Sequence, residues 1–327
     1  MIWGKNNAAP NYERLRVVVG DGNPDTAAAI TAALHLRGVT EVIQCYSTER
    51  LGRALDEQII DLVIYDYHML DDQFGPTMQR IRRKEMGRNP FVTIIATLRE
   101  AKADTVRRLI NAGVDDLISV PVSIDRIFES IEKSARRRRP FVVTHDYVGP
   151  ARPGLRDLSR EGVDICLAAP NTLRSRAFDG TPEDEILALV AAAVSHIVAR
   201  QLETCGIEID RLAHCVADGY DADHGWELTE AMRGDLGKMA EAANDLSHRA
   251  AGTASDCVSD LAAAFIPIAR RILVAPTGRA TVEVRLLSQL AAAVRMALSV
   301  DIDADSTIRA IADAVSGFSR DHRLTVA

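Results

Sequence analysis

Asp66 is the residue whose type and position most clearly indicate chemistry. It ends the apolar run 60–66 and is followed by the polar stretch 67–75. Buried parallel strands are near-continuous apolar runs, and open α/β sheets bind ligands beyond the carboxyl ends of their strands. The pattern therefore predicts a carboxylate at the edge of a sheet where α/β proteins carry their chemistry.

Asp66 belongs to a repeating pattern of strand and helix in the first part of the chain. Strands are predicted at 15–19, 41–46, 60–66, 91–95 and 116–120. Each is followed by a segment with helical spacing of apolar residues, and the last helix covers about 124–137. Parallel neighbours need crossover helices, so this alternation predicts a doubly wound α/β fold with a five-stranded parallel sheet.

The second part of the chain is predicted to be helical. Residues 140–181 form a connector rich in proline and glycine with one strand-like piece at 141–144, and much of it is expected to pack on one domain because long bare loops are uncommon. A helix starts at Thr181-Pro182-Glu183-Asp184, and Ile186, Val190, Ala193, Ile197 and Gln201 form its apolar stripe. Further helices are expected near 226–252, 255–274, 279–299 and 304–319. The predicted domains are 12–139, the connector 140–181 and an all-α bundle at 182–322.

The charge distribution does not favour a nucleic-acid partner. The 327 residues carry a formal net charge of −7, which gives no overall basic field for a phosphate backbone. The local exception is the run Arg136–Arg139 before Pro140. We interpret it as the solvated end of a helix, where cations interact well with the helix dipole. The helices after residue 182 show no helix-turn-helix signature, so DNA binding is not expected.

Other features indicate a cytoplasmic protein that is not an enzyme. The five cysteines are scattered without a C-x-x-C spacing, which favours a reducing compartment. The polar residues 1–14 do not resemble a signal peptide, and no uncharged apolar run approaches the length of a membrane span. Neither a Ser–His–Asp arrangement, a G-x-S-x-G motif nor a glycine-rich nucleotide loop after His248 is evident. The breadth of the apolar stripe at 186–202 predicts a homodimer, and the lack of a span-length apolar run predicts no membrane partner.

Residues 12–135 resemble the receiver domain of bacterial two-component response regulators, of the chemotaxis type. In that family the aspartate that matches Asp66 accepts a phosphoryl group from a histidine. The resemblance implies a Mg²⁺ site formed by Asp21, Asp66 and the backbone carbonyl of His68. It also implies a histidine kinase or another response regulator as partner.

The chain departs from the family pattern at several positions. The second acid after the first strand is replaced by Gly22, the lysine before Pro121 by Val120, and the aromatic switch residue by Leu117. The hydroxyl switch position falls on Ala96 or Thr97. A unit cation near a phosphoryl oxygen is worth, gross, about 4 kcal/mol at ~4 Å and an effective dielectric of about 20. These losses leave two alternatives: an atypical receiver that is phosphorylated at Asp66, or a receiver fold used only for docking and dimerisation. The first requires Asp66 to lie near Asp21 and not to be buried beneath the helices.

A second candidate phosphoryl carrier is His248. The segment 248–254 resembles the signature of histidine-phosphotransfer modules, with Gly252, Thr253 and Ala254 matching or nearly matching and Ala251 at the lysine position. The apolar residues of this helix are expected on the opposite face, with His248 toward water and Gly252 one turn along the helix. An ordinary surface histidine is the alternative. The sequence thus predicts a signalling adaptor with Asp66 or His248 as carriers, or else a phosphorylation-independent scaffold.

Overall fold

The computed structural model describes residues 10–70, 73–121, 123–152, 166–220, 228–252, 256–274 and 280–299. The chain divides into two compact units, Met1–Ile197 and Val198–Ala327. The division falls inside one long helix, α8 (Glu183–Asp218), which contributes to both units. Each unit is described by itself below.

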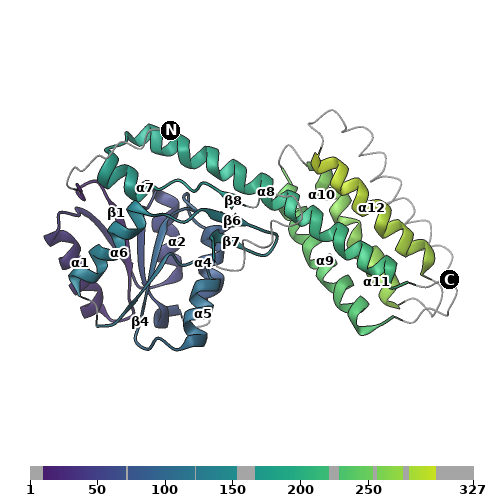
Figure 1. The fold of residues 1–327 in the computed structure, drawn as a ribbon, viewed down its shortest axis with the longest axis horizontal. Helices are drawn as coiled ribbons and strands as arrows, with labels where there is room; N and C mark the ends of the chain where they lie inside the picture. Colours follow the sequence, from purple (N-terminus) through teal and green to yellow (C-terminus); the bar gives the residue numbers. More distant parts are fainter. Residues whose placement is uncertain are drawn as a thin grey trace. The chain divides into compact units, whose positions relative to one another are not determined.

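The first unit is built on a five-stranded parallel sheet (Figure 1). Its strands are β1 (Arg16–Gly20), β2 (Glu41–Cys45), β3 (Leu62–Asp66), β4 (Thr93–Leu98) and β5 (Asp116–Ser119), in the order β2-β1-β3-β4-β5. β3 and β4 are buried along their whole length, as expected for the inner strands of a parallel sheet covered on both faces. The predicted doubly wound fold is confirmed.

Helices cover both faces of this sheet. The helices are α1 (Pro24–Leu36), α2 (Thr48–Glu57), α4 (Phe74–Arg82), α5 (Ala103–Asn111) and α6 (Ile124–Arg136). Apolar residues of α1 and α6 pack together on one face, and those of α2, α4 and α5 pack on the other. The side chains of Asn23, Ser47 and Ser123 accept hydrogen bonds from the first turns of α1, α2 and α6, which fixes where these helices begin.

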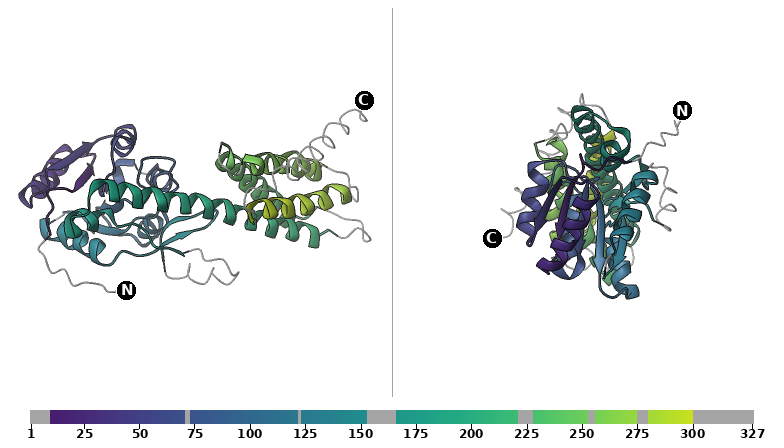
Figure 2. Two further views of the ribbon diagram at one scale, coloured as in Figure 1. Left: turned by 90° about the horizontal axis from the view of Figure 1, so that it is seen from above. Right: turned by 90° about the vertical axis from the view of Figure 1, so that its left-hand side faces the viewer.

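Much of the predicted connector packs on this first unit. β6 (Phe141–Val143), β7 (Val148–Pro150) and β8 (Cys166–Leu167) form a small antiparallel sheet in the order β7-β6-β8, where the sequence predicted only one strand. Phe141 shares an apolar cluster with Phe91, which precedes β4, and with Ala193 and Ile197 of α8. The beginning of α8 therefore lies against the same unit, as Figure 2 also shows. The stripe predicted to mediate dimerisation is buried within the chain itself.

The arginine run at the end of α6 is exposed at Arg136, Arg137 and Arg139, as expected for a solvated helix end, but that interpretation is wrong for Arg138. The side chain of Arg138 is buried, contacts the carbonyl of Phe91 and lies 3.9 Å from the carboxylate of Asp115. Burial lowers its pKa to about 10, partly offset by Asp115. Arg138 lies in the short connection between α6 and β6, and this connection places its side chain beside Phe91 and Asp115 instead of in solvent.

Arg82 occupies the same region at the amino edge of the sheet and is fully buried. Its guanidinium donates five hydrogen bonds: to the carbonyls of Pro90 and Val92, twice to that of Gly113, and to Asp115 at 2.7 Å. A guanidinium has five N–H donors, so every donor of this group is used.

A second buried ion network joins the strands to the start of α8. It involves Arg176, in the π-helix Ser175–Asp179 that follows α7 (Thr172–Arg174). Arg176 bonds Asp61 at 2.9 Å and also Glu183, and Arg16 of β1 bonds Glu183 at 2.8 Å. Burial raises the pKa of Asp61 to about 6, although Arg176 and the backbone N–H of Arg16 favour its charged form. The bond from Arg176 lowers the pKa of Glu183 to about 2.

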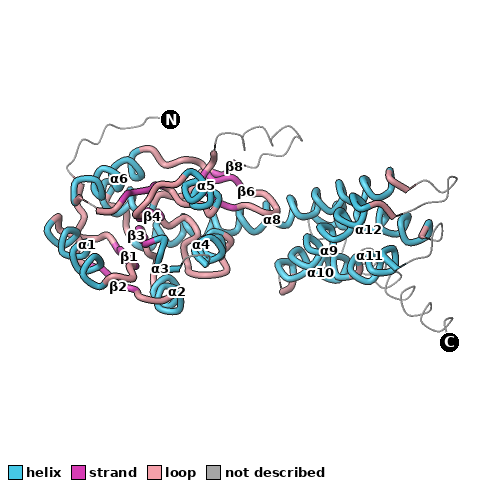
Figure 3. The backbone as a smooth tube through the Cα atoms, turned by 90° about the horizontal axis from the view of Figure 1, so that it is seen from below, coloured by secondary structure: helices cyan, strands magenta, loops and turns pink. Residues whose placement is uncertain are grey.

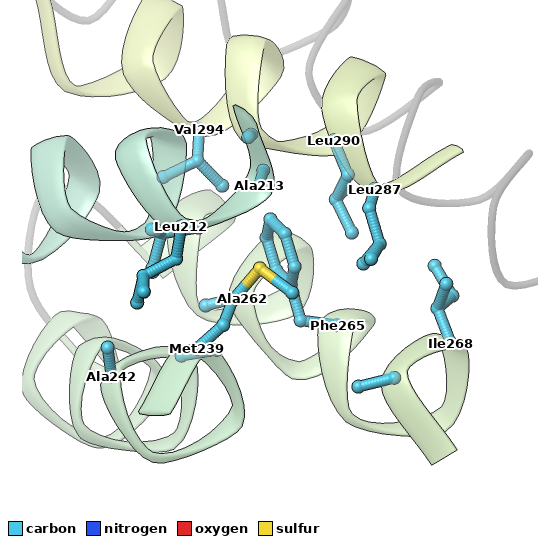
Figure 4. Packing of buried hydrophobic residues seen from close by; sticks show 14 of the residues in the cluster. Leu212, Ala213, Met239, Ala242, Ala262, Phe265, Ile268, Leu287, Leu290 and Val294 are labelled. Carbon is cyan, nitrogen blue, oxygen red and sulfur yellow. The ribbon is translucent and has the colours of Figure 1, made fainter. Parts of the chain in front are cut away.

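Helices are the regular structure of the second unit in its described residues, with turns between them (Figure 3). The end of α8 packs with α9 (Glu230–Ala250), α10 (Asp256–Ala263), α11 (Phe265–Val274) and α12 (Thr281–Ser299). Met239 and Phe265 lie at the centre of their core (Figure 4). The single helix predicted at 255–274 is two helices, because Pro267 lacks an N–H and its ring clashes with the carbonyl of Ala263. The helix predicted at 304–319 lies outside the described residues.

The network at Asp61 leads to a prediction about stability. Arg176→Met leaves the carboxylate of Asp61 buried without a cation, so we expect a loss of about 3–5 kcal/mol in the free energy of unfolding of the first unit. The control is Arg37→Met, which removes an exposed pair with Asp125 and is expected to cost less than about 1 kcal/mol. Urea unfolding followed by circular dichroism measures both, and equal small losses would contradict the importance of this network.

Candidate functional site

The register of the sheet brings the two predicted acids to one edge. Asp66 is the last residue of β3, and its neighbour Tyr65 pairs with Gly20, the last residue of β1. Asp21 follows Gly20 directly. The acids therefore lie at the carboxyl ends of adjacent strands, at the place where open α/β sheets bind ligands.

Both carboxylates are more enclosed than an open rim position would be. Asp21 is 4% exposed and Asp66 is 5% exposed. Asp21 Oδ1 accepts a hydrogen bond from the backbone N–H of Asn23 at 2.8 Å, whereas Asp66 Oδ1 is buried and has no hydrogen-bond partner. The proximity to Asp21 that the signalling interpretation requires is present, but the expected exposure of Asp66 is reduced to a small area.

The electrostatics of the site disfavour two ionised acids. Burial raises the pKa of Asp66, and the charge of Asp21 raises it further. The backbone N–H of His68, the imidazole of His68 and the guanidinium of Arg99 oppose this rise. A bound cation is the simplest way to compensate two neighbouring carboxylates, because it favours the charged form of both.

Close packing between Tyr65 and Gly20 positions the two acids. A Cβ atom at Gly20 would lie 2.0 Å from the ring of Tyr65, so only glycine fits there. The Tyr65 ring is fully buried and also contacts Phe74 of α4, with ring centroids 6.5 Å apart. Because Tyr65 precedes Asp66 and Gly20 precedes Asp21, this contact holds the two strand ends in a fixed relation.

The structure distinguishes between the two candidates for the hydroxyl position. Thr97 pairs with Asp66 across β3 and β4, whereas Ala96 pairs with Tyr65 and belongs to the apolar cluster on one sheet face. Residues paired in a parallel register point to the same side, so Thr97 is the one that accompanies Asp66. Val120 follows β5, and Leu117 packs at the edge of the apolar cluster, so neither supplies a polar group to the site.

Gly22 leaves open space where the family places a second acid. A Cβ atom at this position would meet nothing within 4 Å, and its backbone does not adopt a left-handed conformation. The missing carboxylate is therefore not excluded by packing, and the site differs from the family pattern here in charge and not in shape.

The segment after Asp66 differs from the predicted loop. Tyr67–Leu70 forms the short helix α3, in which His68 lies two residues after Asp66 with its side chain exposed. Within the described part of the chain, no group of three or more His, Cys, Asp or Glu side chains is arranged to hold a metal ion. The donors that fit Mg²⁺ are thus the carboxylates of Asp21 and Asp66, with the His68 carbonyl and water completing an oxygen set. The partnerless buried Oδ1 of Asp66 fits such a cation.

Arg99 is a candidate site residue that the sequence did not reveal. It follows β4, two residues after Thr97, and its charge is close enough to Asp66 to lower the pKa of that carboxyl. Its side chain is exposed, and no salt bridge to it occurs among the described residues. The signal in the sequence is only its spacing from Thr97, which has meaning once the register of β3 and β4 is known.

His248 lies on the exposed face of α9, as predicted. Met232, Leu236, Met239, Ala243, Leu246 and Ala250 are all buried on the opposite face. However, α9 ends at Ala250, and Gly252 lies beyond it with a φ of 71°, where its N–H bonds Asp256. The prediction that Gly252 lies one turn along the helix is therefore wrong, because this glycine belongs to the turn that leaves the helix. Thr253 and Ala254 lie outside the described residues.

α8 is the one described helix that is long and apolar enough to cross a membrane by length and composition. Only 33% of its most apolar 18-residue window is buried. This is weak evidence for a span, because helices of protein cores satisfy the same criteria. Ala193 and Ile197 pack in a cluster with β6, which accounts for part of its apolar character. The five cysteines form no disulfide.

Comparisons with known proteins bear on the first unit. Residues 17–132 match the family model "Response regulator receiver domain", and these residues are a receiver domain. A solved structure described as a response regulator receiver protein from Pseudomonas putida is similar, with 24% sequence identity and a TM-score of 0.33, and the match covers 37% of this chain and 97% of that one. No curated protein matches the chain.

The enclosed Asp66 leads to a prediction about pH. Its pKa is raised in the folded protein, so the stability linked to its protonated form is fully present below about pH 3.9 and is lost as pH rises through the folded pKa. At pH 7 we expect Asp66→Asn to unfold at a higher temperature than the natural chain. The gain should shrink toward pH 4, and millimolar Mg²⁺ should reduce it at pH 7. Thermal unfolding at several pH values measures this, and a gain independent of both pH and Mg²⁺ would argue against the electrostatic cause.

Proposed function

We propose that the chain accepts a phosphoryl group on Asp66 and passes this signal to its helical unit, as a non-enzymatic member of a two-component system. A receiver domain implies two-component signalling. The observation that carries the proposal is the pair of adjacent, enclosed carboxylates, Asp21 and Asp66, with one oxygen of Asp66 left without a partner.

The residues of the site have complementary roles in this transfer. An oxygen of Asp66 forms a bond to phosphorus while the P–N bond of a donor phosphohistidine breaks, and the donor imidazole keeps the bonding electron pair. Asp21, Asp66 and the His68 carbonyl would hold Mg²⁺, which would supply positive charge beside the phosphoryl group. The hydroxyl of Thr97 lies beside the product and can donate to a phosphoryl oxygen.

Arg99 supplies a positive charge in the absence of the family's lysine. Val120 occupies the lysine position on β5, while Arg99 leaves the adjacent strand β4, nearer in the sheet to β3. Guanidinium groups form paired hydrogen bonds to phosphoryl oxygens, so an arginine at this edge is suited to the role. Its electrostatic effect on Asp66 supports the assignment.

Acetyl phosphate with Mg²⁺ tests this proposal directly. We expect an acid-labile mass gain of one phosphoryl group on the natural chain and none on Asp66→Asn. Arg99→Ala should slow the reaction about tenfold, which corresponds to about 1.4 kcal/mol, while Arg99→Lys should retain most of the rate. Gly22→Asp should accelerate it or lower the Mg²⁺ concentration required, because the added carboxylate has room and completes the acidic pair.

The controls distinguish a specific loss of phosphorylation from a general loss of folded protein. Arg107→Ala removes another exposed arginine of the same domain and should leave the rate unchanged. Absence of label on both the natural chain and Gly22→Asp would refute phosphorylation of Asp66. It would favour the alternative function, a scaffold that uses the receiver fold only for docking.

His248 is a second proposed carrier, supported by its exposure on α9. A phosphoryl-carrying imidazole must be reachable by a partner domain, and the buried face of α9 leaves His248 directed to solvent. Label supplied by a panel of phosphorylated kinases and receivers should reach His248 and disappear in His248→Ala. Transfer that is unaffected by His248→Ala would restrict the carrier role to Asp66, and the helical unit would then act through interaction alone.

We also propose a homodimer, formed through the exposed side of α8. Leu189 is about half exposed, and the small residues Ala188 and Ala192 are exposed beside it on the same side of the helix. Only one third of the apolar window of this helix is buried by the chain itself. Small side chains let two helices approach closely, and a two-fold pairing presents the same face on both copies.

Light scattering at micromolar concentration tests the dimer. We expect twice the chain mass of 35.6 kDa for the natural protein. Leu189→Lys should yield the monomer, because it places a charge in the apolar interface. Val282→Lys changes an equally exposed residue on α12 and should leave the dimer intact. A natural chain that is monomeric, or a dimer that both variants preserve, would refute this interface.

A further inference from the structure

A pocket lies between α4 and α5, which cover the same face of the sheet. It is next to the proposed phosphorylation site. Its volume is about 320 Å³, and its lining includes Tyr67, Phe74, Pro76, Gln79, Arg108 and Leu109. α4 and α5 are neighbours in Figure 1, so the pocket belongs entirely to the receiver domain. Small-ligand sites have volumes of about 300–1,000 Å³, so this pocket suits a compact ligand.

One wall of the pocket is aromatic. The ring of Tyr67 packs against Phe74, with centroids 5.7 Å apart and planes at 57°, and against His68 at 5.3 Å. Phe74 is fully buried, so it holds Tyr67 in place, while Tyr67 keeps part of its surface exposed. A flat ligand can stack on this held phenol ring.

Gln79 gives the pocket an unused acceptor. Its Nε2 donates to the carbonyl of Asn111 at 3.3 Å, which fixes the orientation of the amide. Its Oε1 is shielded from solvent and has no hydrogen-bond partner. Buried polar atoms nearly always have a partner, so this oxygen calls for a donor. Gln79 lines the pocket, so a ligand donor meets this oxygen when the amide turns and gives up its bond to Asn111.

Arg108 places a cation at the mouth of the pocket. Its side chain is exposed, and no salt bridge to it occurs among the residues that the structure describes. The neighbouring Arg107 differs, because it pairs with Asp104 and does not line the pocket. An arginine of this kind suits a ligand that carries a phosphate or carboxylate outside its ring.

We propose that this pocket binds a planar nitrogen heterocycle with an N–H donor edge and an anionic substituent, of the purine nucleoside monophosphate class. The ring stacks on Tyr67, its N–H donates to Gln79 Oε1, and its anion pairs with Arg108. Tyr67 follows Asp66 directly, so an occupied pocket fixes the residue next to the phosphoacceptor. The site thereby links a small molecule to the receiver, although the binding itself does not depend on phosphorylation.

Isothermal titration of the full chain tests the donor edge with two matched purines. Theophylline and caffeine differ by one ring N–H that caffeine carries as N–CH₃. We expect theophylline to bind at least tenfold more tightly, and Gln79→Leu to remove this difference. GMP should bind more tightly than guanosine, and Arg108→Ala should remove that preference while Arg107→Ala keeps it.

Hydrogen exchange on the natural chain provides a second measurement that needs no variant. With theophylline bound, peptides from 74–82 and 103–112 should exchange more slowly, and those from α12 should not change. The proposal is overturned by any of three results: no heat and no protection at millimolar ligand, equal affinity for the two purines, or preferences that survive both Gln79→Leu and Arg108→Ala. Titration and hydrogen exchange measure binding alone, so their result does not depend on whether Asp66 accepts a phosphoryl group.

Discussion

The structure of the candidate site depends on two like charges held side by side with little access to solvent. The register of β1 and β3 sets Asp21 next to Asp66, and the Tyr65 ring packs closely over Gly20 beside them. Burial and mutual repulsion both favour protonation of Asp66. An enclosed carboxylate with a partnerless oxygen is costly to a fold, and a cation or a cationic side chain relieves the cost. The feature that weakens the isolated domain is therefore the one that makes this position a candidate ligand site.

At the opposite edge of the same sheet, buried acids are paired with guanidinium groups. Asp115 lies before β5 and receives a hydrogen bond from Arg82, whose five donors are all used, and Arg138 lies close to the same carboxylate. Asp61, before β3, is held by Arg176. At that edge each acid has a guanidinium beside it, and these pairs attach the small sheet and α8 to the receiver domain. In this unit, the acids that are paired with a guanidinium stabilise the structure, whereas the neighbouring acids without such a pairing form the candidate site.

Much of this could be predicted from the sequence because the relevant signals are local. The five strands are short apolar runs between turn residues, and Asp21 and Asp66 follow two of them directly. Other features depend on contacts between distant residues. From the sequence, Arg138 is expected at the surface, whereas the structure places its side chain near Asp115. Arg99 becomes a candidate site residue only through the register of β3 with β4. The break at Pro267 was visible in the sequence, but the apolar spacing on both sides of it favoured one continuous helix.

The departures from the receiver pattern concern charge more than shape. Gly22 leaves room for the missing acid, Thr97 stands in register with Asp66, and Val120 replaces a cation without disturbing β5. A domain used only for docking gains nothing from two adjacent enclosed acids, since neutral side chains of similar size would relieve their repulsion. A domain that binds a cation and a phosphoryl group needs these acids, and Arg99 lies where it can replace part of the lost positive charge. The charges at this edge therefore favour a site that still binds a cation, although more weakly, over a receiver fold that no longer accepts a phosphoryl group.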